Sequence, residues 1–169
     1  MKPVAHVLFA LALAGVQAAL LRWLGGGSFS LALPAACVIY VALHGGNVDG
    51  SISAAGVGYV MDLMGGSPKG LMTFLAVALF LAVRATSAAV DVRSRSGFAA
   101  LSGLGALFLS VGALLLTRYT APPEAAPGAI LLPRILGEAV LTGALSPIVL
   151  AGLRRVDGLF HREEAGLLR

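Results

Sequence analysis

Charged residues are scarce in this chain, and their scarcity excludes an ordinary soluble domain. Asp, Glu, Lys and Arg make up 12% of the 169 residues, hydrophobic residues make up 58%, and the mean hydropathy is +0.92. Soluble domains are typically about one quarter charged. A chain of this length corresponds to one domain. We therefore expect a single membrane-embedded domain over residues 1–169.

Cysteine is almost absent, and the sequence also lacks recognisable catalytic motifs. The one cysteine, Cys37, lies in an apolar run. It cannot form an internal disulfide, and it lacks the Cys/His spacing that a metal site needs. The HExxH motif is missing, and no Ser/His/Asp or Cys/His set stands out. We predict that the protein is not an enzyme and holds no metal or cofactor.

The positive charge does not have the pattern of a nucleic-acid-binding protein. The formal net charge is +4, but the 12 Lys and Arg residues are separated by apolar runs, and aromatic residues make up only 7% of the chain. A nucleic-acid-binding surface typically shows a basic patch or stripe. We therefore predict no nucleic-acid partner and interpret the basic residues as signals of membrane topology.

Six apolar runs, separated by Gly, Pro and charged residues, predict an all-α bundle of six transmembrane helices. The runs cover residues 4–21, 29–43, 51–64, 71–90, 97–117 and 130–153. Four of them reach or approach the roughly 20 residues that cross a bilayer. The second and third are shorter, and free backbone polar groups cannot face lipid. We therefore expect these two helices to lie inside the bundle.

The basic residues predict that both termini are cytoplasmic. With that orientation the inner side carries eight of them: Lys2, Arg84, Arg93, Arg95, Arg154, Arg155, Arg162 and Arg169. The outer side carries Arg22, Lys69 and Arg118, with Arg134 at the mouth of the sixth span. Positive charge accumulates on the cytoplasmic side of membrane proteins. Residues 154–169 then form a solvated or interfacial tail.

The segment from Gly58 to Gly70 places an acidic residue, Asp62, near the end of an apolar run. A carboxylate in a membrane segment is costly, so it marks a functional or structural site. Arg134 and Glu138 lie four residues apart, on one helical face, at a similar expected depth. We predict a buried polar cluster of Asp62, Arg134 and Glu138, acting either as a lock between helices or as a ligand or proton site. After Asp62, a helix-hairpin turn is predicted at Gly65, Gly66, Pro68 and Gly70.

Small residues recur every four positions in two runs. They are Ala10, Ala14 and Ala18 in the first run and Ser102, Ala106 and Ser110 in the fifth. Such spacing lets helices approach closely in lipid. These faces serve either internal packing or the docking of a partner helix. Pro147, inside the sixth run, predicts a bend near residues 143–147.

Two segments resemble the bacterial rod shape-determining family MreD, whose members are small multi-pass membrane proteins. The first is Pro34-Ala-Ala-Cys-Val-Ile-Tyr-Val-Ala-Leu-His44-Gly, and the second extends from Ala55 through Asp62 and Gly65-Gly-Ser-Pro68-Lys-Gly70 to Phe74. Length and number of spans agree with the family. His44 departs from it, because the family often has a basic residue after the second span.

The resemblance implies a non-catalytic scaffold of the cell-elongation and peptidoglycan-synthesis machinery in the bacterial cytoplasmic membrane. It implies a single-pass partner of the MreC type and, indirectly, RodA, a penicillin-binding protein and the MreB filament, besides membrane lipid and homo-oligomers. The family's fold is also similar to the substrate-binding S component of energy-coupling-factor vitamin transporters, which is the alternative function. A vitamin site needs convergent polar and aromatic groups, and few are expected in the outer half of this chain.

Overall fold

A computed structural model describes residues 2–23, 31–65, 68–87, 94–120 and 131–166. It contains six α-helices: α1 (Lys2–Trp23), α2 (Leu33–His44), α3 (Asn47–Gly65), α4 (Leu71–Ser87), α5 (Arg95–Thr120) and α6 (Leu131–Gly166). None of the described residues forms a β-strand. The predicted all-helical fold with six helices is confirmed. The limits differ most at α6, which continues 13 residues beyond the predicted end at Leu153.

Helix α2 lies at the centre of the bundle. Every residue from Leu31 to Ala42 is buried. Its buried N-terminus is satisfied by side chains of other helices: the Ala32 N–H donates to Thr142 Oγ1 at 3.2 Å, and the Leu33 N–H donates to Gln17 Oε1 at 3.2 Å. A buried helix end without such partners would be costly. The prediction that the second helix lies inside the bundle is therefore confirmed.

Helix α3 departs from the same prediction. It begins at Asn47 rather than at Ser51 and has 19 residues. Only one of its faces is buried, and the large side chains of Ile52, Tyr59 and Leu63 are exposed on the other. This helix therefore lies at the side of the bundle, where it contacts α1, α2 and α4.

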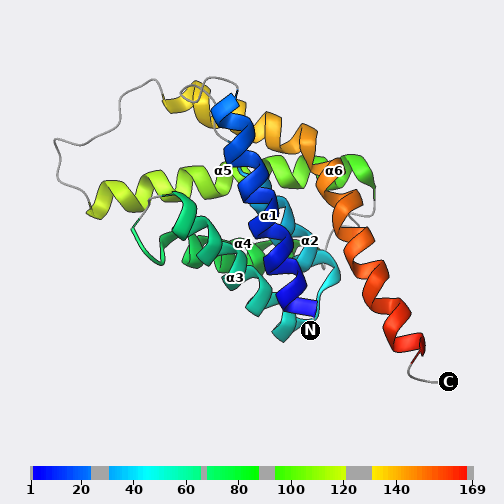
Figure 1. Cartoon of the computed structure of the whole chain (residues 1–169). Coiled ribbons are helices and arrows are strands. Elements are labelled where there is room, and N and C mark those ends of the chain that lie inside the picture. Colours follow the sequence, from blue (N-terminus) through cyan, green and yellow to red (C-terminus); the bar gives the residue numbers. More distant parts are fainter. Residues whose placement is uncertain (1, 24–30, 66–67, 88–93, 121–130, 167–169) are drawn as a thin grey trace.

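Helices α5 and α6 make the most extensive helix–helix contact among the described residues. A Cβ added at Gly103 would lie 3.1 Å from the Ala139 carbonyl oxygen, and one added at Gly143 would lie 3.0 Å from the Ala99 carbonyl oxygen. Glycine and alanine at these positions let the two backbones touch. Beyond this crossing α6 bends away from α5 (Figure 1), and Pro147 lies inside the helix there. The predicted bend is present.

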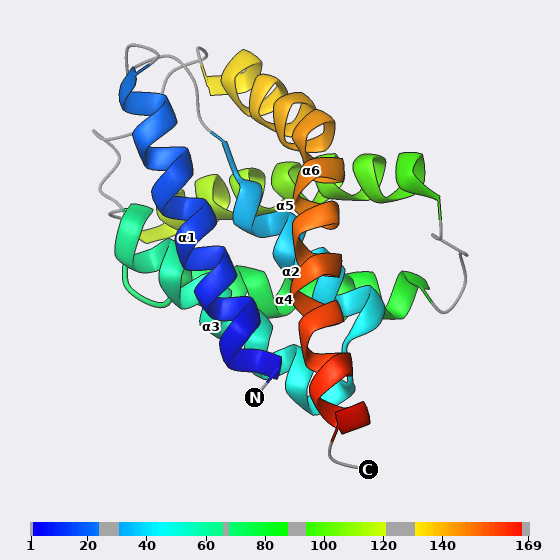
Figure 2. The same ribbon diagram turned by 45° about the vertical axis from the view of Figure 1, so that its right-hand side comes forward.

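The first and last helices meet at one side of the molecule. Helix α1 crosses the bundle, and both chain ends lie on the same side in two views (Figures 1 and 2). The ring of Phe9 lies against Gly152, where an added Cβ would be 2.7 Å from the ring carbon Cζ. The chain therefore begins and ends at the same side of the bundle.

Within the described ranges, two helices are long and apolar enough to cross a membrane, at Arg95–Tyr119 and Leu132–Gly158. The sequence led us to expect four runs of about this length. In the most apolar 18-residue window of each helix, only 22% of α5 and 39% of α6 is buried by the protein itself. Most residues of these windows are therefore not fully buried by the protein itself.

Candidate functional site

Asp62 caps the N-terminus of α4. Its carboxylate accepts hydrogen bonds from the backbone N–H groups of Gly70 (3.0 Å), Met72 (2.8 Å) and Thr73 (3.0 Å), and from the Thr73 hydroxyl (2.7 Å). The first N–H groups of a helix have no partner within the helix, and its dipole favours a negative charge there. One buried carboxylate therefore ties the end of α3 to the start of α4.

Glycines bring the two helices close enough for this contact. A Cβ at Gly58, one turn before Asp62, would lie 2.6 Å from Thr73 Cα and 2.8 Å from the Met72 carbonyl oxygen. Gly70 adopts φ 93°, a conformation that favours glycine, immediately before α4 begins. Of the predicted turn residues, Gly65 ends α3, Pro68 and Gly70 lead into α4, and Gly66 lies outside the described residues.

The predicted cluster of Asp62, Arg134 and Glu138 is not assembled, which corrects the sequence analysis. The start of α4 donates hydrogen bonds to Asp62, while Arg134 is exposed on α6. Glu138 instead accepts a hydrogen bond from the Ser110 hydroxyl at 3.0 Å, between α6 and α5. The backbone donors of α4 lie only eight to eleven residues beyond Asp62, so they reach its carboxylate more easily than a side chain of α6.

The two predicted docking faces are mostly packing faces. Ala10, Ala14, Ser102 and Ala106 are buried, Ser110 is half-buried, and Ala18 alone is exposed. Because small residues permit close helix packing, the protein's own helices cover these positions. The alternative of internal packing therefore describes both stripes better than partner docking does.

A second polar site joins three helices near the chain ends. The Tyr40 hydroxyl donates to Asp157 Oδ2 at 2.5 Å, and His6 Nε2 lies 3.1 Å from Asp157 Oδ1. His44 stacks on the Tyr40 ring with 4.5 Å between the ring centroids. The Asp157 carboxylate thus connects α6 to α1 and α2. We call His6, Tyr40 and Asp157 the terminal junction.

The terminal junction borders a pocket of about 220 Å³. Its wall is completed by the turn between α2 and α3, at Gly45 and Gly46, and by the first two turns of α3, where Asp49 and Ser53 contribute polar side chains. The Arg84 guanidinium holds this turn by donating to the Ala42 and Gly45 carbonyl oxygens at 3.2 and 2.5 Å. In the described part of the chain, no group of three His, Cys, Asp or Glu side chains could hold a metal ion.

The sequence analysis did not identify this junction. His6 and Asp157 are 151 residues apart, and the Asp157 region was interpreted as a solvated tail. One local signal was available: Tyr40 and His44 are four residues apart, so they lie on one face at the end of an otherwise apolar helix. That spacing indicates a polar site, although it does not indicate the partner.

No family model, curated protein or solved structure matches this chain. A function for this protein must therefore be inferred from its own residues and their geometry.

Proposed function

We propose that this protein is a membrane-embedded, non-catalytic scaffold of the MreD type that binds a single-pass membrane partner. Six helices would lie in the membrane, with both termini on the cytoplasmic side. The observation that carries the membrane assignment is the distribution of polarity across α5 and α6.

On these two helices, hydroxyl side chains are buried while large apolar side chains are exposed. Ser102, Thr142 and Ser146 are fully buried, whereas Leu104, Val140 and Ile148 on the same two helices are exposed. A soluble protein rarely exposes large contiguous apolar surface. In a bilayer, hydrocarbon chains cover such surface. The Thr142 hydroxyl accepts a hydrogen bond from the Ala32 N–H, and the Ser146 hydroxyl donates one to the Gly143 carbonyl oxygen within α6.

The hairpin of α3 and α4 supports the scaffold assignment. The segment that resembles the MreD family, from Ala55 to Phe74, forms this hairpin, and its acidic residue, Asp62, fastens the two helices together. A rigid hairpin is a structural element suited to holding partners in place. Its carboxylate has a structural role that requires no substrate.

The partner helix then needs a face other than those filled by internal packing. On α1, the positions Leu8, Ala12, Gly15 and Ala19 follow helical spacing, and three of them are exposed. A Cβ added at Gly15 would meet no atom within 4 Å. We propose that this outward stripe of α1 receives the partner's transmembrane helix.

Two substitutions at neighbouring positions test the docking face. Gly15→Leu adds bulk outside the protein, so we expect it to abolish co-purification of an MreC-type partner without lowering the melting temperature. Ala14→Leu adds bulk to a buried position and should lower the melting temperature itself. If wild-type protein retains no single-pass partner, the scaffold proposal fails. A tightly bound vitamin in native mass spectrometry would instead favour the transporter S component.

Labelling with a membrane-impermeant maleimide in intact cells tests the topology. Cys37 is buried, so cysteines introduced at exposed positions report separately. We expect Tyr119→Cys to react from outside and Ser94→Cys, at the other end of α5, to react only after the cells are opened. Reaction of Ser94→Cys in intact cells would contradict the proposed orientation.

A further inference from the structure

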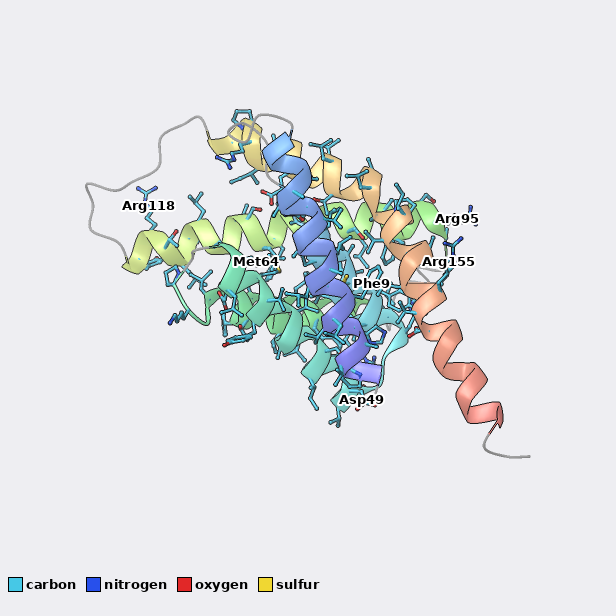
Figure 3. The ribbon with its side chains drawn as sticks, in the orientation of Figure 1. Phe9, Asp49, Met64, Arg95, Arg118 and Arg155 are labelled. Atoms are coloured by element: carbon cyan, nitrogen blue, oxygen red, sulfur yellow. The ribbon has the colours of Figure 1, made fainter. Side chains whose placement is uncertain are left out.

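Two ends of the molecule carry exposed arginines with different surroundings. Arg95 and Arg155 lie towards one side of the molecule, and Arg118 lies at the other (Figure 3). Arg95 and Arg118 are the near-terminal basic residues of one helix, and their 23-residue separation corresponds to a rise of about 35 Å. That rise slightly exceeds the roughly 30 Å hydrocarbon core of a bilayer.

On the side that includes Arg155, the exposed arginines make no ion pair with another described residue. These arginines are Arg95, Arg154 and Arg155. The nearest acidic residue along α6 is Asp157, which is engaged by Tyr40 and His6 in the terminal junction. Because the side chains of Arg154 and Arg155 are both exposed, a ligand can reach them from outside the protein.

An apolar stripe leads to these arginines along α6. Val140, Ala144, Ile148, Ala151 and Arg155 are all exposed and follow one another at intervals of three or four residues, so they share one face. Val140 and Ile148 are each 71% exposed. Apolar side chains followed by a cation on one face match a phospholipid, whose acyl chains and anionic headgroup are arranged in the same order.

We propose that Arg154 and Arg155 bind the headgroup of an anionic phospholipid whose acyl chains lie along the α6 stripe. This inference rests on the membrane embedding proposed above. Basic residues next to a membrane segment attract the anionic lipids of the cytoplasmic leaflet, and guanidinium groups are well suited to pairing with phosphate. The bound lipid would hold the segment of α6 beyond the Pro147 bend against the membrane surface.

Native mass spectrometry of the detergent-purified full chain tests this site. The protein is incubated with equal amounts of phosphatidylglycerol and phosphatidylcholine, and the two bound lipids are compared. Wild type should retain phosphatidylglycerol preferentially. In the double variant Arg154→Gln/Arg155→Gln, the preference for phosphatidylglycerol should fall by about fivefold for each of the two arginines removed. Arg154→Lys/Arg155→Lys should keep most of it, because the positive charge remains.

Arg134→Gln is the matched control, because Arg134 is also exposed on α6 but lies near its other end. It should leave the lipid preference unchanged. An unchanged preference in the double glutamine variant, or an equal loss in Arg134→Gln, would overturn the proposal. The readout needs no partner protein. Lipid preference without a co-purifying partner would therefore contradict only the scaffold proposal, and a partner without lipid preference would contradict only this inference.

Discussion

Two carboxylates connect helices in this protein over very different distances along the chain. Asp62 accepts hydrogen bonds from residues eight to eleven positions later, within one hairpin. Asp157 is engaged by Tyr40 and His6, which are 117 and 151 positions earlier. The first contact forms as soon as α3 and α4 pair. The second forms only when the first, second and last helices have come together.

The two sites also differ in how completely protein surrounds the carboxylate. Asp62 is 6% exposed and is held largely by backbone donors of α4. The Asp157 side chain is 27% exposed and borders a pocket. Charged hydrogen bonds are stronger where water is excluded. The hairpin carboxylate should therefore contribute more to stability, and the junction carboxylate should depend on how the chain ends are arranged.

Removing the Asp62 carboxylate should have the largest effect. Asp62→Ala leaves the first N–H groups of α4 without acceptors, and we expect a loss of about 3 kcal/mol, because charged acceptors and buried donors are lost together. Asp62→Asn keeps an acceptor oxygen and should cost less than half as much. Thermal unfolding in detergent measures both. Wild-type melting of Asp62→Ala would show that the cap contributes little to folding.

Gly58→Ala tests whether close approach is as important as charge in the same hairpin. The added methyl group would meet the backbone of α4 at Thr73 and Met72, which cannot move without disturbing the cap. We expect a loss of about 2 kcal/mol from overpacking. Gly137→Ala is the control, since its Cβ would meet no atom within 4 Å. The control should match or exceed the stability of wild type, and equal effects at both positions would reject the steric explanation.

The two carboxylates also show which features could be predicted from the sequence: local ones could, and the partners of a side chain could not. The six helices follow from apolar runs and their breaks, and the bend follows from Pro147, because these signals are local. The importance of Asp62 could be inferred from its place between Gly58 and Gly70. Its partner could not, because an arginine on another helix and the backbone of the next helix both satisfy a carboxylate in an apolar segment.

Contacts between helices far apart in the sequence could not be predicted for a related reason. His6 and Asp157 each resemble ordinary interfacial residues until α1 and α6 are placed side by side. The small-residue stripes of α1 and α5 indicate close packing, but they do not indicate whether the neighbouring helix belongs to the same chain. Only the burial of Ala10 and Ser102 decides that question.

A double-mutant cycle on Asp157 and Tyr40 tests the long-range contact. Asp157→Ala should lower the free energy of unfolding by about 1.5 kcal/mol, less than Asp62→Ala, because water partly replaces the lost contact. With Tyr40→Phe, the coupling energy should be about 1 kcal/mol. Chemical or thermal unfolding of the four proteins provides the cycle. Strictly additive losses would mean that the hydroxyl and the carboxylate do not interact in solution.

Arg134→Gln should have the smallest effect, and it separates the structure from the sequence-based hypothesis. If Arg134 neutralised Asp62, its removal would strand a buried carboxylate and destabilise the protein as much as Asp62→Ala does. In the structure, Arg134 is exposed, and the Asp62 carboxylate accepts hydrogen bonds from the start of α4. Substitutions at such surface positions usually change stability by less than about 0.5 kcal/mol. Arg134→Gln should therefore melt like wild type, and its effect should add to that of Asp62→Ala within about 0.5 kcal/mol. A larger coupling energy in the double variant would instead support an ion pair between Arg134 and Asp62.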